Sequence, residues 1–207
     1  MKKILLLGLI SFLCFNIIGC NRIIGENSRT FISVVDNESE DKYEQEGIYG
    51  EKEVSTIKDM LNDYGDEKDL EVSKALGKNL VVIKEQEFIG NEDIWNKFYN
   101  NTKNKVEDSV IIVRYTEQGD PILTYLSYKN NKYFMIEDET RDRYDENQED
   151  YNQYEFKYLR IFEDNNYKYA YLLNDKNITL DELNYSLSSS DTSKWIPYGF
   201  IFYINKS

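Results

Sequence analysis

The chain has 207 residues, of which 41% are hydrophobic and 14% aromatic, enough to form a buried core in one ordinary domain. Its 38 acidic and 25 basic side chains give a formal net charge of −13, so we expect neither nucleic acid nor anionic lipid headgroups as direct partners. Histidine is absent and there are only two cysteines, which excludes Ser-His-Asp and Cys-His catalysis, His-ligated metals and a disulfide framework.

The N-terminus predicts a secretory signal peptide over residues 1–19. Lys2 and Lys3 form a short positive region, and an apolar stretch covers residues 4–18. A membrane-spanning helix needs about 20 apolar residues, so this stretch is too short to span a bilayer. Without residues 1–19, the chain keeps 23 basic and 38 acidic side chains, a formal charge of −15.

The apolar stretch ends in Ile17-Ile18-Gly19-Cys20, which resembles the lipobox of bacterial lipoproteins. The resemblance implies cleavage between Gly19 and Cys20 and attachment of diacylglycerol to the Cys20 thiol. Two acyl chains anchor a protein stably where one chain is marginal. We therefore expect a lipid-anchored protein on the extracytoplasmic face of the cell membrane. A plain signal peptide with an accidental cysteine and an uncleaved anchor are the alternatives.

Residues 20–46 predict a polar, acidic tether between Cys20 and a single globular domain over residues 47–207. The exception within the tether is the apolar run FISVV at residues 31–35, which is short enough to be a further strand of the domain. Both interpretations of residues 31–35 stay open from the sequence.

Helical patterns dominate the first part of this domain. A helix is predicted from Glu51 to Gly65, with apolar residues recurring on one face, and a second short helix over residues 67–76. Residues 80–84 predict a strand. Asn91 is then expected to cap a helix that runs to about Lys103 and buries Ile94, Trp95 and Phe98.

The rest of the chain is mostly β. Strands are predicted over residues 109–116, 121–128, 132–137, 154–162, 167–173 and 198–204. Asn130-Asn131 and Asn165-Asn166 suit tight hairpin turns because asparagine tolerates positive φ, and Thr179 to Glu182 is a capping box. The pattern indicates an α+β fold, with an antiparallel sheet of about five to six strands and N-terminal helices packed on one face.

The tract RYTEQGDPI at residues 114–122 resembles the signature of an uncharacterised family of Gram-positive bacterial lipoproteins, a domain of unknown function. The similarity covers roughly residues 72–138, including the short strand predicted before Asn91. The acidic segment and the tyrosine-rich hairpin downstream do not follow the family pattern. The resemblance implies a secreted lipoprotein with an α+β fold and implies no chemical activity.

Within this tract, Gly119 permits positive φ, Asp120 can bond neighbouring amides and Pro121 begins the next strand. The predicted strands on either side of it should be antiparallel neighbours, because too few residues separate them for a parallel crossover. We expect the Arg114 guanidinium near a carboxylate such as Asp120. The functional alternative is that Arg114 and Asp120 line a binding pocket.

Residues 137–150 contain eight carboxylates and two arginines. Clustered oxygens suit calcium, but the segment lacks the glycine and the spacing of an EF-hand loop. We expect a solvated loop with no strong calcium site. Calcium binding that disappears on removal of Asp142, Asp145 and Glu146 would contradict this. No other segment predicts a metal or a cofactor.

Fourteen of the eighteen tyrosines lie from Tyr115 onward. Tyr154 and Tyr158 are predicted on one face of a strand, and the tyrosines of residues 167–171 share a face of the next strand. An exposed row of this kind can stack on a sugar or a peptide, whereas cross-strand core packing explains it equally well. Tyr154 and Tyr158 join Arg114 and Asp120 as candidate binding residues.

The sequence predicts a non-enzymatic binding or accessory lipoprotein, with an envelope or extracellular protein or glycan as its partner. The alternative is a histidine-free hydrolase that attacks envelope or carbohydrate substrates with paired carboxylates. No carboxylate pair stands out from the sequence for that role.

Overall fold

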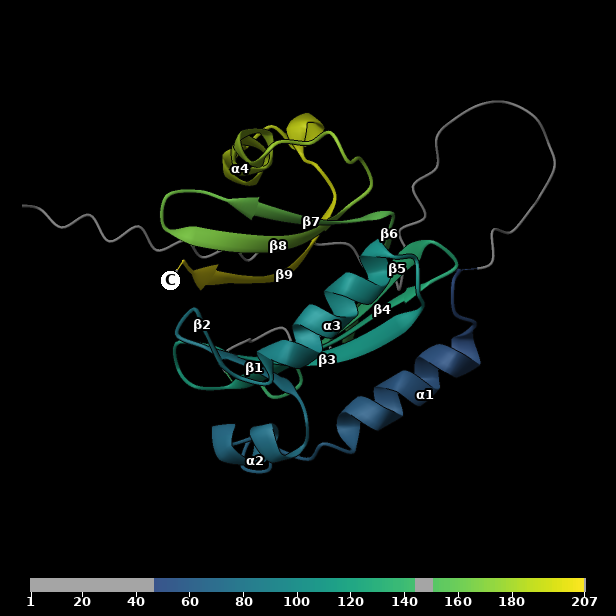
Figure 1. Cartoon of the computed structure of the whole chain (residues 1–207), viewed down its shortest axis with the longest axis vertical. Helices are drawn as coiled ribbons and strands as arrows, with labels where there is room; N and C mark the ends of the chain where they lie inside the picture. The colour runs from purple at the N-terminus through teal and green to yellow at the C-terminus, as the bar shows by residue number, and fades with distance from the viewer. Residues whose placement is uncertain (1–46, 144–150, 207) are drawn as a thin grey trace, which may run out of the picture. The chain divides into compact units, whose positions relative to one another are not determined.

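The computed structural model describes residues 47–143 and 151–206, which lie within one compact unit (Figure 1). In these ranges the elements are α1 (Glu51–Asn62), α2 (Val72–Gly77), β1 (Val81–Lys84), β2 (Glu87–Gly90), α3 (Glu92–Lys103), β3 (Asp108–Tyr115), β4 (Pro121–Lys129), β5 (Lys132–Asp138), β6 (Tyr151–Phe156), β7 (Tyr158–Glu163), β8 (Tyr167–Leu173), α4 (Leu180–Ser188), the 3₁₀ turn η1 (Thr192–Lys194) and β9 (Tyr198–Asn205). None of the helices in this part of the chain is both long and apolar enough to cross a bilayer.

Six strands form the larger sheet in the order β2-β1-β3-β4-β5-β6. The pairing of β3 with β4 is antiparallel, as the sequence predicts, and Arg114 lies opposite Ile122. The sheet is mixed, however, because β1 runs parallel to β3. The connection between these two strands includes β2 and α3, which is long enough for a parallel crossover. Neither β2 nor this crossover was predicted from the sequence.

One face of the six-stranded sheet is covered by α1 and α2. Ile57 and Leu61 of α1 and Ala75 of α2 are buried against side chains of the central strands, among them Val113 and Phe134. Helices α1 and α2 thus form a helical layer on this face, but α3 and α4 follow later in the chain, so the helices are not all N-terminal as expected. The helix predicted over residues 67–76 is shorter, and begins at Val72.

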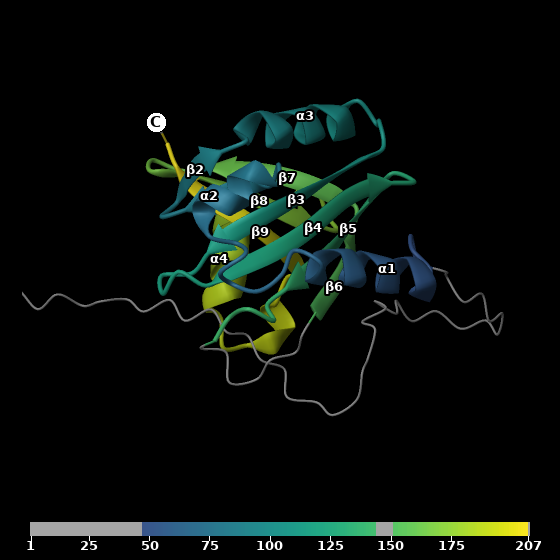
Figure 2. The same cartoon turned by 90° about the horizontal axis from the view of Figure 1, so that it is seen from below.

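The opposite face is covered by α3 and by a second sheet, so helices occur on both faces rather than on one (Figure 2). Trp95 and Phe98 of α3 pack against Val110 and Ile112 of β3, which confirms that this helix buries the two aromatic side chains as predicted. Asn91 precedes α3, but it has φ 59° and its side chain does not cap the helix. Its amide instead donates to the backbone carbonyl oxygens at Leu76 and Leu80.

The second sheet has three antiparallel strands in the order β7-β8-β9. The single strand predicted over residues 154–162 is wrong, because the chain leaves the six-stranded sheet after Phe156 and begins β7 at Tyr158. At one end of β9, Gly199 is close to Phe156 of the β6 edge. At the other end, Asn205 donates to the carbonyl oxygen of Gln86, next to the β2 edge. Strand β9 therefore crosses the six-stranded sheet.

Helix α4 packs on the face of the three-stranded sheet that is turned away from the six-stranded sheet (Figure 1). Leu183 of α4 is fully buried there, together with Tyr171 and Leu173 of β8. The predicted capping box begins this helix, since the Thr179 hydroxyl accepts from the Glu182 amide at 3.2 Å. We call the α4 side of the three-stranded sheet its outer face.

Candidate binding surface

Strand β8 places every second side chain on the outer face. Tyr167, Tyr169 and Tyr171 share this side, while Ala170 and Leu172 point into the core between the two sheets. The sequence prediction that these three tyrosines share a face is confirmed, because successive side chains of a regular strand alternate.

Strand β9 adds two further rings to the outer face by means of a bulge. Tyr171 pairs with Phe200, but Ala170 pairs with Phe202, so Ile201 is the extra residue on β9. A bulge of one residue resets the alternation of the strand. As a result Phe200 and Tyr203 both lie on the outer face, while Ile201 and Phe202 belong to the core.

Four rings form a connected cluster that we call the aromatic face: Tyr167, Tyr169, Phe200 and Tyr203. The Tyr167 and Tyr203 rings meet edge to face, with centroids 5.5 Å apart. The Tyr169 and Tyr203 rings are 6.1 Å apart and nearly parallel, and the Phe200 and Tyr203 rings are 6.2 Å apart. Tyr203 has 37% of its surface exposed, and the other three rings are half-buried.

Helix α4 covers one end of the outer face and leaves the other end accessible to solvent. At the α4 end, Tyr171 is only 6% exposed, and burial raises its pKa to about 12. Its ring is 6.4 Å from that of Tyr169 and 5.5 Å from that of Phe200. The aromatic face is thus the solvent-accessible continuation of a buried aromatic cluster. The buried Tyr171 ring packs against Tyr169 and Phe200 of the aromatic face.

Asp164, in the β7–β8 turn, holds the polar rim of the aromatic face in place. The Tyr169 hydroxyl donates to its carboxylate at 2.7 Å, and the amides of Asn166 and Tyr167 donate to the same side chain at 2.8 Å. These hydrogen bonds lower the pKa of Asp164, while burial and the Asp164 carboxylate raise the pKa of Tyr169. The carboxylate therefore stays ionised and the hydroxyl stays protonated at neutral pH.

Arg114, a candidate from the sequence, lies beside the aromatic face. Its guanidinium is 5.1 Å from the centre of the Phe200 ring and forms an ion pair with Glu137 of β5. The expectation of a carboxylate near Arg114 is confirmed, but that carboxylate is Glu137 and not Asp120, which pairs with Arg143. Arg114 of β3 and Glu137 of β5 lie on either side of β4 and project from the same face of the sheet. Their side chains therefore meet over β4.

Asp120, the second candidate, is buried and forms an ion pair with Arg143. Its carboxylate is 1% exposed and accepts from Arg143 at 2.6 and 2.9 Å, which holds the pKa of Asp120 below its ordinary value. The expected turn is present before it, since Gly119 has φ 91° and its amide donates to the Thr116 carbonyl oxygen. The structure does not bring Asp120 to the aromatic face.

Tyr154 and Tyr158 are separated by the break between the sheets. Tyr154 is 39% exposed on β6 of the six-stranded sheet, with its ring 6.3 Å from that of Phe156. Tyr158 is 37% exposed on β7, opposite Leu173. It belongs to the outer face, at the end where α4 packs.

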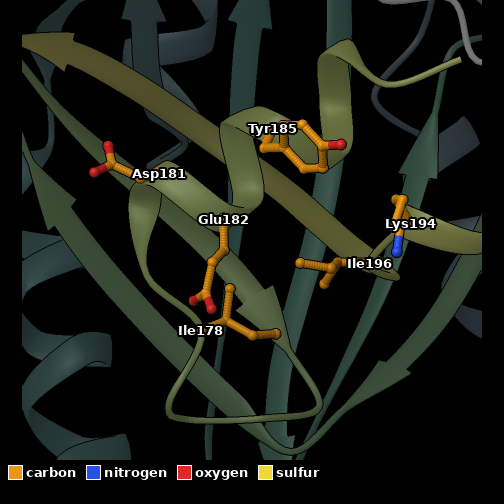
Figure 3. A pocket seen from close by; sticks show the side chains of 6 residues that line it. All are labelled: Ile178, Asp181, Glu182, Tyr185, Lys194 and Ile196. Atoms are coloured by element: carbon orange, nitrogen blue, oxygen red, sulfur yellow. The ribbon is translucent and has the colours of Figure 1, made fainter. Parts of the chain in front are cut away.

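A hollow of about 390 Å³ lies beside α4, and Figure 3 shows the side chains that line it. Its lining consists of Ile178, Asp181, Glu182, Tyr185, Lys194 and Ile196. The Glu182 carboxylate is occupied, because it accepts from the amide and the hydroxyl of Thr179 at 2.8 Å. Asp181 points away from Glu182 and Ile178 (Figure 3), so the hollow does not assemble a pair of acids.

The described residues give no support to the hydrolase alternative. Their buried carboxylates, Asp120 and Asp138, each bind an arginine, and a general acid would need a raised pKa rather than the lowered pKa of Asp120. Within residues 47–143 and 151–206, no group of three or more acidic, histidine or cysteine side chains is arranged to hold a metal. Asp145 and Glu146 of the acidic segment lie outside these ranges, as do Gly19, Cys20 and residues 31–35.

A comparison with known protein families finds a match over less than half of the chain. Residues 78–170 match a domain of unknown function, DUF4362. The match contains the tract at residues 114–122 and extends beyond the segment 72–138 for which the sequence shows a resemblance. It ends within β8, so β9 and α4 lie outside it. No curated protein and no solved structure matches the chain.

The sequence identified only part of the aromatic face. The alternation of β8 was readable, and it gave Tyr167 and Tyr169. Phe200 and Tyr203 were missed because YGFIFYI contains apolar residues at consecutive positions, and alternation alone does not locate a one-residue bulge.

Proposed function

We propose that the chain is a lipid-anchored extracytoplasmic protein that binds an envelope or extracellular partner through the aromatic face. The anchor is supported by Ile17-Ile18-Gly19-Cys20 after a short apolar stretch. The binding role is carried by one observation: four contacting rings remain accessible on a sheet face that α4 covers only at its other end. Accessible aromatic clusters of this kind are enriched at binding surfaces.

The aromatic face lies away from the first described residues of the chain. The described chain enters at the β6 edge, where the Ile48 amide donates to the Glu155 carboxylate at 2.5 Å. Tyr203 lies near the end of β9 that contacts Gln86, next to the β2 edge. Because β2 and β6 are opposite edges of the larger sheet, the aromatic face lies away from the point where the N-terminal segment joins.

The binding role is tested by sedimentation with isolated cell walls of the producing bacterium, freed of lipid. Full-length chain in detergent should pellet with the walls, and Tyr203→Ala or Tyr169→Ala should weaken this association by about tenfold, the loss of one well-placed ring contact. Tyr154→Ala is the matched control, since Tyr154 has nearly the same exposure on the other sheet. Equal loss in all three variants, or loss in Tyr154→Ala alone, contradicts the proposal.

The anchor is tested by Cys20→Ser. Without the thiol no thioether to diacylglycerol can form, so the variant should lose lipid labelling and remain in the aqueous phase after detergent phase separation. The wild-type chain should enter the detergent phase. A Cys20→Ser chain that enters the detergent phase as the wild type does would show that lipid on Cys20 is not the anchor.

A further inference from the structure

We infer that the ligand of the aromatic face is an uncharged oligosaccharide, an inference that rests on the binding role proposed above. A sugar ring presents a patch of C–H groups on one face and hydroxyl groups around its rim. The C–H patch packs against the electron-rich face of an aromatic ring, and the hydroxyl groups require polar partners beside it. The aromatic face offers both features.

The size of the aromatic face favours a small ligand. Each protein of a standard protein–protein interface buries about 800 Å². A fully buried aromatic side chain contributes about 150–250 Å², and three of the four rings are already half-buried. The accessible area therefore falls short of what a second copy of the chain or a globular partner needs.

The types of side chain on the aromatic face also favour a small ligand over a protein partner. The large aliphatic side chains that the described residues expose are Ile89 on β2, Val106 before β3 and Leu187 on α4, and none of them belongs to the aromatic face. Protein interfaces combine aromatic side chains with other apolar groups in a desolvated centre. A surface made of rings alone, with hydroxyl groups at their edges, suits stacking of sugar rings better.

The charges around the β7–β8 turn are balanced, which favours an uncharged ligand. Lys206 lies 3.2 Å and Lys168 3.7 Å from the Glu163 carboxylate, and the Lys206 ammonium also donates to the Asp164 backbone carbonyl oxygen. Two lysines thus offset the carboxylates of Glu163 and Asp164. Since residues 20–207 carry a formal charge of −15, an anionic polymer would be repelled by the rest of the molecule.

The polar partners are held ready for hydroxyl groups. The Asp164 carboxylate is fixed by Tyr169 and two backbone amides, and an ionised carboxylate accepts further hydrogen bonds because each oxygen has two lone pairs. Tyr203 presents its hydroxyl at the most exposed ring of the cluster. A ligand stacked on Tyr203 and Tyr169 would therefore meet polar groups at its edge.

The test is calorimetry with defined oligosaccharides and the full-length chain, in a detergent without a sugar headgroup. The probes are cellohexaose and chitohexaose, which are uncharged, and hexagalacturonic acid, which is anionic at pH 7. We expect at least one uncharged probe to bind, with Tyr203→Ala weakening it by about tenfold and Tyr203→Phe, which keeps the ring, by less than about threefold. Tyr154→Ala should stay within about twofold of wild type.

Each outcome decides between ligand classes. No binding of either uncharged probe up to about 10 mM, equal or tighter binding of the anionic probe, or equal loss in Tyr203→Ala and Tyr154→Ala would overturn the inference. If cell-wall sedimentation still depends on Tyr203 while the uncharged probes fail, the binding role stands and the glycan assignment alone is wrong. Thermal melts followed by circular dichroism establish that each variant is folded.

Discussion

At the scale of single residues, three arginines set the electrostatics of the described domain. Each binds one buried or half-buried carboxylate; the pairs are Arg114–Glu137, Arg141–Asp138 and Arg143–Asp120. Arg141 also donates to the carbonyl oxygens of Leu61 and Gly65, which ties the end of α1 to the β5 strand. These arginines are structural, because a buried carboxylate without a partner is costly.

Replacing Arg114 by alanine should lower the free energy of unfolding by about 1–3 kcal/mol, because Glu137 would keep its half-buried position without its partner. The Arg114 Nε has no hydrogen-bond partner among the described residues, so the ion pair with Glu137 is the polar contact that the variant loses. Urea denaturation of Arg114→Ala, Glu137→Gln and the double variant measures the coupling. Additive losses would show that the two side chains do not stabilise one another.

Asp120 should make the domain sensitive to acid. Its folded-state pKa is lowered by Arg143, so the folded state binds fewer protons than the unfolded chain in that range. The stability from this pair is fully present above the unfolded pKa of about 4 and is lost as the pH falls through the lower folded value.

Asp120→Asn should therefore remove part of the fall in stability between about pH 5 and pH 2 and cost about 1 kcal/mol at pH 7, a modest value because Arg143 is largely exposed. Urea midpoints over this pH range test it. Parallel pH curves for wild type and variant would assign the acid sensitivity to other groups.

At the scale of elements, the sequence predicted what depends on local backbone chemistry. The hairpin turn at Asn130-Asn131 has positive φ at both residues, and the capping box at Thr179 begins α4. What the sequence did not predict depends on distant partners. The parallel pairing of β1 with β3 depends on the crossover through β2 and α3, and the break at Lys157 and the bulge at Ile201 depend on how the two sheets pack. No signal within a short window specifies these features.

The turn between β3 and β4 tests whether local backbone chemistry sets the structure of this hairpin. Gly119 has φ 91°, and a Cβ atom added there would meet no atom within 4 Å, so only backbone strain opposes a side chain. Gly119→Val should lower the free energy of unfolding by about 1–3 kcal/mol. Gly119→Asn is the control and should lose less, because asparagine tolerates positive φ. Equal urea midpoints for wild type and Gly119→Val would mean that the turn rearranges at no cost.

At the scale of the whole molecule, the described residues form successive packed layers: α1 and α2, the six-stranded sheet, the three-stranded sheet with α3, and α4. Three clusters of buried side chains lie between these layers of the described chain. The sequence predicted the α+β class and one largely antiparallel sheet. It did not predict the second sheet, which builds the aromatic face. The candidate site therefore depends on the part of the fold that local patterns specify least.

The most direct test of the proposed binding role is fluorine NMR of full-length chain labelled with 3-fluorotyrosine, with single Tyr→Phe variants assigning the resonances. The titrant is a muramidase digest of cell walls from the producing bacterium. We expect the resonances of Tyr167, Tyr169 and Tyr203 to shift together, while those of Tyr154 and Tyr185 stay in place. Shifts confined to Tyr154 or Tyr185, or no shift at any tyrosine, would contradict it.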